Sequence, residues 1–174
     1  MKRLFPWMLA LLIATPLLAT TVVSVPVGES VRLSGLIVKG EVLNLYAGLD
    51  AEGQIVTNVT VAVSETLKGD APVGGTVTFQ AWGGSLGGFN VETVGEAKYS
   101  VGEKVLVQLE DIDGTWHTLG LAFGKWNVQT DRDGEEILRR DLSELCLVLS
   151  DSAPVNEISM HEFKRLAKAV QVGR

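Results

Sequence analysis

Hydrophobic and polar residues alternate most regularly between Ile55 and Ser64. A period of two places successive side chains on opposite faces of an extended strand. β-Branched residues dominate the run and a Lys68-Gly69-Asp70 turn follows it, which favours a strand over a helix. A strand over residues 55–66 would extend roughly 40 Å, and a strand this long must coil, as the strands of barrels do. The more hydrophobic face carries Ile55, Thr57, Val59, Val61 and Val63.

Other runs with β character lie on both sides of this strand. Asp113-Gly114 and Asp133-Gly134 each separate two such runs, and Asp-Gly between apolar-rich stretches is a strong hairpin signal. The glycine-rich segment 83–88 is expected to be irregular, because each glycine inside an element costs about 1 kcal/mol. Residues 36–138 therefore predict a mainly β meander of antiparallel strands that closes into a barrel. The expected strands include residues 36–45, 76–82, 89–94 and 105–109.

The carboxy-terminal residues change from a period of two to a helical period. Ser159 and Glu162 have the spacing of a capping box, in which the two residues satisfy each other's backbone N–H groups. The sequence predicts an amphipathic helix over residues 160–171, packed on the barrel. A shorter helical turn is expected at residues 29–33. The apolar stripe of the long helix carries Met160, Phe163, Leu166, Ala167 and Val170.

The amino terminus has the pattern of a secretory signal. Lys2 and Arg3 precede an apolar run at residues 7–19, which ends near small residues. The run is shorter than a membrane span needs and contains Pro16, so we expect cleavage between residues 19 and 24 and no stable membrane anchor afterwards. The sequence thus predicts an exported protein, periplasmic or extracellular.

Length and charge narrow the class of protein further. Removal of residues 1–19 leaves about 155 of the 174 residues, enough for one domain with one core. We expect the barrel at residues 20–150 and the helical tail at 151–174. The net charge of −6 becomes −8 when Lys2 and Arg3 are removed, which argues against a nucleic-acid partner. The single cysteine, Cys146, excludes an internal disulfide.

One stretch has a catalytic-looking pattern. Residues 83–87 fit the G-x-S-x-G of a nucleophile elbow, with Ser85 as the nucleophile. That motif needs a strand, a tight turn and then a helix, whereas residues 89–94 alternate as a strand. A serine hydrolase on Ser85 is therefore an alternative rather than the leading hypothesis. No metal or other cofactor is expected, because Asp111 and Asp131 start Asp-Gly turns in which the glycine comes too early for a calcium loop.

The remaining candidate is a recognition surface. Aromatic residues lie at or near strand ends beside the glycine-rich segment, and aromatic rings supply contact area at low entropic cost. Such loops could hold a peptide, a glycan or a protein. The alternative is that the rings fill the core of the barrel. The candidate binding residues are Trp82, Gly83, Gly84, Phe89 and Trp126.

Three motifs carry a family resemblance: the strand that ends in Leu67-Lys68-Gly69, the Gly83-Gly84 pair, and Gly102-Glu103-Lys104-Val105-Leu106-Val107. Over about residues 36–130 the chain resembles small exported bacterial proteins of uncharacterised function. It is also similar to netrin-like modules and tissue inhibitors of metalloproteinases, which implies an OB-type barrel. Those inhibitors bind the protease zinc through an amino-terminal cysteine and are held together by disulfides, and this chain has neither feature.

The function expected from these observations is that of a non-enzymatic, exported binding or interaction module. Modulation of an extracytoplasmic protease is the specific role that the resemblance suggests. The alternatives are the small serine hydrolase and a structural component of the cell envelope.

Overall fold

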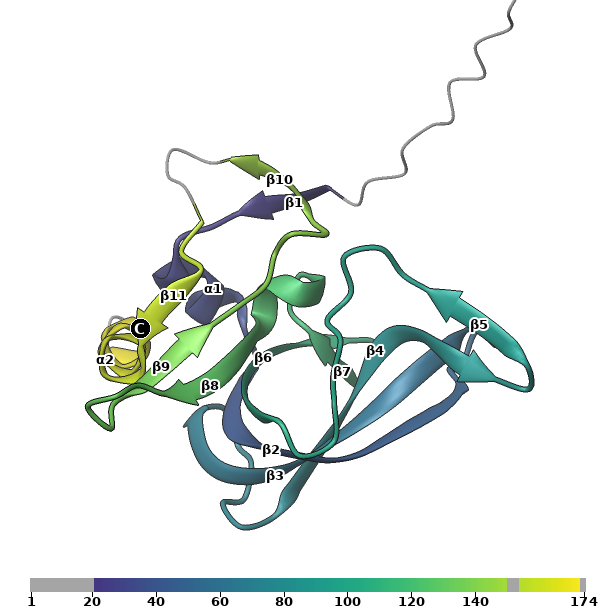
Figure 1. Cartoon of the computed structure of the whole chain (residues 1–174), viewed down its shortest axis with the longest axis horizontal. Coiled ribbons are helices and arrows are strands. Elements are labelled where there is room, and N and C mark those ends of the chain that lie inside the picture. Colours follow the sequence, from purple (N-terminus) through teal and green to yellow (C-terminus); the bar gives the residue numbers. More distant parts are fainter. Residues whose placement is uncertain (1–20, 150–153, 173–174) are drawn as a thin grey trace, which may run out of the picture.

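The computed structural model describes residues 21–149 and 154–172, and it confirms a mainly β chain with a carboxy-terminal helix (Figure 1). The predicted signal segment, residues 1–19, lies outside the described residues. The helical elements are α1 (Val27–Leu33), the 3-10 helix η1 (Leu121–Gly124) and α2 (Met160–Val172). The strands are β1 (Thr21–Ser24), β2 (Leu36–Leu49), β3 (Ile55–Lys68), β4 (Thr76–Leu86), β5 (Phe89–Glu92), β6 (Lys104–Ile112), β7 (Thr115–Thr118), β8 (Lys125–Thr130), β9 (Glu136–Arg139), β10 (Cys146–Leu149) and β11 (Glu157–Ser159).

The long strand predicted from Ile55 is present as β3 and pairs antiparallel with β2 along its length. Val59, Val61 and Val63 are buried, as the alternation predicted, whereas Ile55 and Thr57 nearer the turn are half-buried. Shifts in the β2–β3 register mark bulges, which increase the local twist of a strand pair. The pair therefore curves, as Figure 1 shows.

The sheet is mixed rather than purely antiparallel. Its strand order is β11-β9-β8-β6-β2-β3-β4-β5, and β7 pairs antiparallel with β6 and, through Gln80 and His117, parallel with β4. A separate two-stranded sheet pairs β1 with β10 in parallel. The antiparallel prediction is thus wrong for these two pairs, because both join segments far apart in the chain and local alternation carries no signal for them.

The sheet separates two hydrophobic clusters. The first lies on the face of β3 and β4 that carries Val59, Val61 and Phe79. The second lies between the other face of β2, β6, β8 and β9 and the helices α1 and α2, which cover it (Figure 1). Members of the second cluster are Val27, Val31, Ile37, Leu106, Trp126, Leu138, Met160, Phe163 and Ala167.

The predicted tail helix is confirmed as α2, and Ser159 Oγ accepts a hydrogen bond of 3.1 Å from the N–H of Glu162. This is the N-cap half of the expected capping box. β11 pairs with β9, so the sheet continues beyond the predicted boundary at residue 150.

Helix α1 is longer than the predicted turn at residues 29–33, and a lysine from β3 supports its carboxyl end. Lys68 Nζ donates to the carbonyl oxygens of Val31 at 2.8 Å, Arg32 at 3.0 Å and Ser34. Carbonyl groups at the end of a helix lack partners within it and favour a positive charge. Lys68 thereby joins α1 to the sheet.

Both predicted Asp-Gly hairpins are confirmed. Asp113 and Gly114 have positive φ angles of 52° and 85°, the conformation of a two-residue type I′ turn between β6 and β7. In the second hairpin, Asp131 Oδ1 accepts the N–H groups of Asp133 and Glu135. Those hydrogen bonds build the turn that the sequence predicts.

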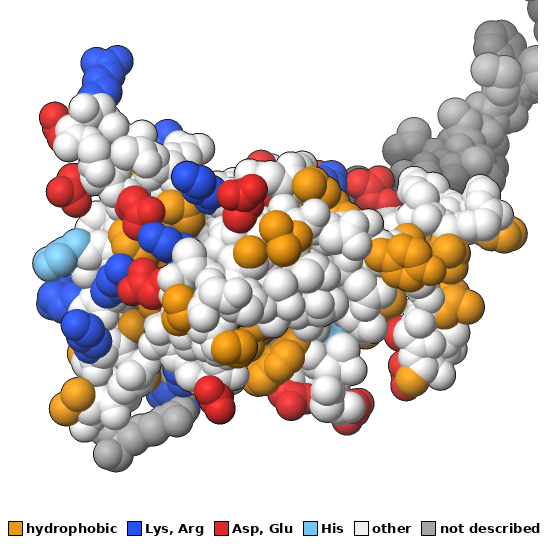
Figure 2. Space-filling model, turned by 90° about the horizontal axis from the view of Figure 1, so that it is seen from below, with side chains coloured by type: hydrophobic (Ala, Val, Ile, Leu, Met, Phe, Trp, Pro, Cys, Tyr) orange, Lys and Arg blue, Asp and Glu red, His pale blue; other side chains and the backbone are white. Residues whose placement is uncertain are grey.

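Hydrophobic side chains stay exposed at the end of the molecule that the β4–β5 hairpin and the adjoining ends of β2 and β3 form, at the right in Figure 2. Phe89 is 73% exposed and Tyr46 66% exposed. Exposed apolar surface of this kind marks candidate interaction sites. In residues 21–149 and 154–172, no helix combines the length and hydrophobicity required to cross a bilayer.

Candidate functional site

The glycine-rich segment 83–88 is a strand and a turn, which corrects the prediction of an irregular loop. Strand β4 continues through Gly83 and Gly84, whose φ angles are 90° and 140°, and then pairs with β5. A Cβ atom would lie 2.5 Å from the Val91 carbonyl oxygen at Gly83 and 2.5 Å from Thr57 Oγ1 at Gly84. Glycine is therefore required here by the close approach of neighbouring backbone and side chain, and this requirement outweighs its low strand propensity.

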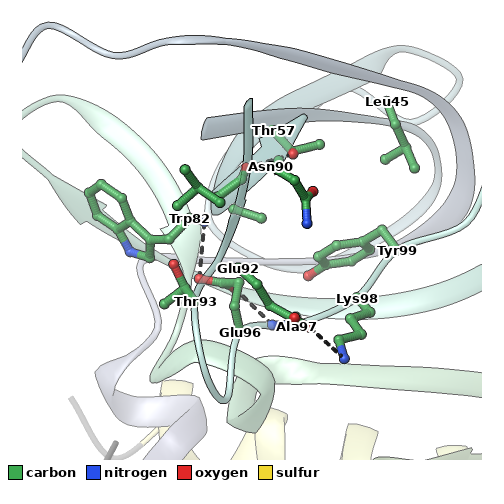
Figure 3. Close-up of a pocket in the computed structure, with 14 residues that line it drawn as sticks. Leu45, Thr57, Trp82, Asn90, Glu92, Thr93, Glu96, Ala97, Lys98 and Tyr99 are labelled. Carbon is green, nitrogen blue, oxygen red and sulfur yellow. Dashed lines mark hydrogen bonds and ion pairs between the residues drawn. The ribbon is translucent and has the colours of Figure 1, made fainter. Parts of the chain in front are cut away.

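A pocket of about 330 Å³ lies beside this part of β4 (Figure 3), and we name it the hairpin pocket. Its walls come from the ends of β2 and β3, from β4 and β5, and from the segment 93–99. Figure 3 shows the amide of Asn90 and the ring of Tyr99 projecting into the pocket, with Leu45 across from them. The lining residues are Leu45, Thr57, Ala81, Trp82, Gly83, Gly84, Asn90, Val91, Glu92, Thr93, Glu96, Ala97, Lys98 and Tyr99.

Glu96 is a buried acid in the wall of this pocket. Its carboxylate accepts the N–H of Trp82 at 3.1 Å and that of Ala97 at 2.9 Å. Burial raises the pKa of Glu96 to about 7, although both hydrogen bonds act in the opposite direction. Sequence reasoning missed this residue, because nothing in the local sequence distinguishes it from the other acids.

Two further groups brace the same wall. The Tyr99 hydroxyl shares a hydrogen bond of 2.8 Å with Thr118 Oγ1, and burial raises the Tyr99 pKa. Lys98 Nζ lies 2.7 Å from a carboxylate oxygen of Glu144 and 3.2 Å from one of Glu92. Both contacts raise the Lys98 pKa, and the contact with Glu144 has the larger effect. The wall is thus linked to β5 and to the chain just before β10.

The predicted binding residues divide into two groups. Trp82, Gly83 and Gly84 line the hairpin pocket, but the Trp82 indole points away from it (Figure 3). The indole stacks on His117 with ring centroids 4.5 Å apart. Phe89 lies beside the turn of the β4–β5 hairpin. These four predicted residues therefore belong to one region of the molecule.

Trp126 is elsewhere, in the second hydrophobic cluster, and is 0% exposed. Its Nε1–H donates to Gln108 Oε1 at 2.9 Å, and the Arg140 guanidinium lies 4.2 Å from the centre of the ring. Trp126 therefore fills the core, which was the alternative to a binding role for the aromatic residues. The prediction that Trp126 belongs to a recognition surface is wrong.

The G-x-S-x-G match lacks the geometry of a nucleophile elbow. Ser85 lies in β4, and the chain turns through Gly87-Gly88 into β5 rather than into a helix. The Ser85 hydroxyl donates to Asn90 Oδ1 at 2.7 Å. Of the two histidines, His117 stacks on Trp82 and His161 lies in α2.

The ends of β2 and β5 meet at the hairpin pocket. A Cβ atom placed on Gly84 would lie 3.4 Å from the Cβ of Ala47, and Leu45 and Val91 both line the pocket. Phe89 and Val91 alternate with Asn90 along β5, so these two exposed side chains share one face of the strand. We name them the apolar border of the pocket.

Within the described residues, no group of three or more His, Cys, Asp or Glu side chains could hold a metal ion. No known family model, curated protein or solved structure matches the chain.

Proposed function

We propose that this chain is an exported, non-enzymatic binding module that takes an extended peptide segment of a protein partner along β5. The observation that carries the proposal is the position of β5 at the end of the sheet order, with all four of its residues exposed. A strand at a sheet edge presents unpaired N–H and C=O groups, and peptides that add a strand to such an edge are a recurring mode of recognition.

The pairing of β5 supports this proposal by identifying the groups that face outward. Leu86 and Phe89 flank the two-residue turn, so they form a hydrogen-bonded pair in an antiparallel hairpin. Backbone groups alternate in direction along a strand. Those of Asn90 and Glu92 therefore point to the open edge, where they would pair with the added strand.

The hairpin pocket and its apolar border supply specificity beyond the backbone. Phe89 is 73% exposed and Val91 45% exposed, and alternate side chains of an added strand would lie beside them. The Asn90 amide and the Tyr99 ring project into the pocket (Figure 3), which would receive one partner side chain. An exported protease remains one candidate partner. The geometry favours an extended peptide segment as the bound element, and it does not single out proteases among the proteins that could supply one.

Two finer proposals accompany this one. We infer an OB-like barrel of β6, β2, β3, β4 and β7, which the pairing of β7 with both β6 and β4 supports. Export is inferred from the charged and apolar pattern of residues 1–19. Sequencing of the mature amino terminus tests the second inference, and a start at Met1 would contradict it.

The peptide proposal is tested by selecting displayed random peptides on the purified protein and measuring their affinities for two variants. Asn90→Pro removes the outward N–H, which an edge strand tolerates, whereas Asn90→Ala removes only the side-chain amide. We expect Asn90→Pro to weaken binding by about tenfold or more and Asn90→Ala to weaken it by less.

Amide chemical shifts provide the second readout. Bound peptides should move the signals of residues 89–92 most. Selected peptides that bind wild type and Asn90→Pro equally, or that move only signals elsewhere, would contradict the proposal.

A further inference from the structure

A second pocket lies on the opposite side of β4 from the hairpin pocket. Buried Phe79 and Ala81 alternate along β4 with Gln80 and Trp82, so the latter two side chains point to the other face. There the Trp82 indole, the turn after β2 and the β6–β7 turn enclose about 310 Å³. We name this space the Trp82–His117 pocket, after two of its lining residues.

Two buried polar atoms of this pocket have no hydrogen-bond partner in the described part of the chain: His117 Nδ1 and Asp50 Oδ2. His117 is 4% exposed and lines the pocket. The other oxygen of Asp50 accepts the N–H groups of Glu52 and Gln54, which fixes the orientation of the carboxylate. Unpartnered buried polar atoms are rare in folded proteins, because each costs free energy that a ligand can recover.

Both atoms can accept a hydrogen bond. Burial lowers the pKa of His117, while the charges of Glu110 and Asp50 act in the opposite direction. The lowered pKa favours the neutral imidazole, which accepts a hydrogen bond at Nδ1 when its proton is on Nε2. The carboxylate of Asp50 is an acceptor only.

The lining residues taken together favour a positive charge. Three carry carboxylates (Asp50, Glu52 and Asp113), and no lysine or arginine is among them. The Trp82 indole adds an aromatic ring, which attracts cations. A metal ion is a poor match, because the described residues hold no cluster of three or more metal-ligating groups.

We propose that the Trp82–His117 pocket binds an organic cation with N–H donors, a guanidinium or an ammonium group. Such a group donates to Asp50 and His117, faces the three carboxylates and lies against the indole. Because the two acceptor atoms do not touch solvent, the cation must displace side chains to reach them. Ala51 and Glu52, exposed in the turn after β2, are the lining residues that we expect to move.

The test uses L-arginine and L-citrulline, which have nearly the same shape but differ in charge. Titrations are followed by the chemical shifts of the Trp82 indole N–H and the His117 ring. We expect arginine to move both signals and citrulline to bind about tenfold more weakly or not at all. Equal binding of the two, or no response to arginine in the folded protein, would overturn the proposal.

Variants locate the site. Asp50→Asn keeps an oxygen for the turn but removes the charge, and it should weaken arginine binding by about tenfold. Glu65→Gln is the matched control, because the carboxylate of Glu65 pairs with Lys164 outside the pocket, and it should leave the affinity unchanged. Equal loss in both variants would overturn the assignment to this pocket.

The source of the cation is distinguished by a short alanine peptide with one central arginine and amidated ends. Tighter binding of the peptide than of free arginine supports a side chain of a protein partner as the ligand. Tighter binding of free arginine supports a small free cation. Failure of the Asn90 experiment leaves this inference intact, because the two pockets lie on opposite faces of β4.

Discussion

Replacement of Glu96 by glutamine should change how the stability of the protein depends on pH. In the folded protein the Glu96 pKa is about 7, against 4.5 for a free side chain. Folding therefore favours the protonated acid. The contribution of Glu96 to stability is greatest below pH 4.5, declines as the pH rises to 7, and is constant above it.

The magnitude follows from that difference in pKa. At about 1.4 kcal/mol per pH unit, the free energy of unfolding should fall by about 3 kcal/mol between pH 4 and pH 8 on account of this one group. Glutamine carries no charge at any of these pH values. It also replaces one accepting oxygen with a donor, so one of the N–H groups of Trp82 and Ala97 loses its partner and a constant offset is expected.

Urea unfolding of the wild type and of Glu96→Gln, measured at several pH values, isolates the effect. The difference between the two proteins cancels the other titrating groups and should vary with pH as described. A difference that stays constant within about 0.5 kcal/mol would refute the reasoning. A ¹³C titration of the Glu96 carboxyl gives an independent check, in which a midpoint near 4.5 rather than 7 would have the same consequence.

Three other substitutions test the packing. Gly84→Ala should lower the free energy of unfolding, measured by urea denaturation, by about 2 kcal/mol or more, because Gly84 has a φ of 140° and the Thr57 hydroxyl would lie 2.5 Å from the new Cβ. Gly87→Ala is the control and should cost less, because the space around Gly87 is open. Trp126→Phe leaves the buried Gln108 without its indole donor and should cost about 1 to 3 kcal/mol while peptide binding by the folded protein stays unchanged. Lys68→Met should cost about 2 kcal/mol in the same assay and should increase amide hydrogen exchange in α1; unaltered exchange would contradict the capping role.

The sequence predicted best the features that depend on neighbouring residues. The alternation from Ile55, the Asp113-Gly114 turn and the stripe of α2 each express a local preference that the structure keeps. In each case the period, the turn chemistry and the capping residues agree with one another. Agreement of this kind makes an element predictable without knowledge of the rest of the fold.

The features that were missed depend on residues distant in the chain. Gly83 and Gly84 looked unsuited to a strand because their partners, Thr57 and Val91, become neighbours only after β3, β4 and β5 have assembled. The burial of Trp126 likewise depends on α1 and α2 covering the sheet. A glycine-rich segment can be a loop or part of a closely packed strand, and an aromatic residue can bind a partner or fill the core. Tertiary contacts decide between these roles, and local sequence does not reveal them.

Trp82 takes part in both pockets, since its backbone N–H holds Glu96 on one side of β4 and its indole stacks on His117 on the other. A ligand that shifts this residue from either side alters the free energy of binding at the second site. Thermodynamic linkage makes the coupling reciprocal, so each ligand changes the affinity of the other by the same factor. Titration of an arginine probe in the presence and absence of a selected peptide would measure that factor directly.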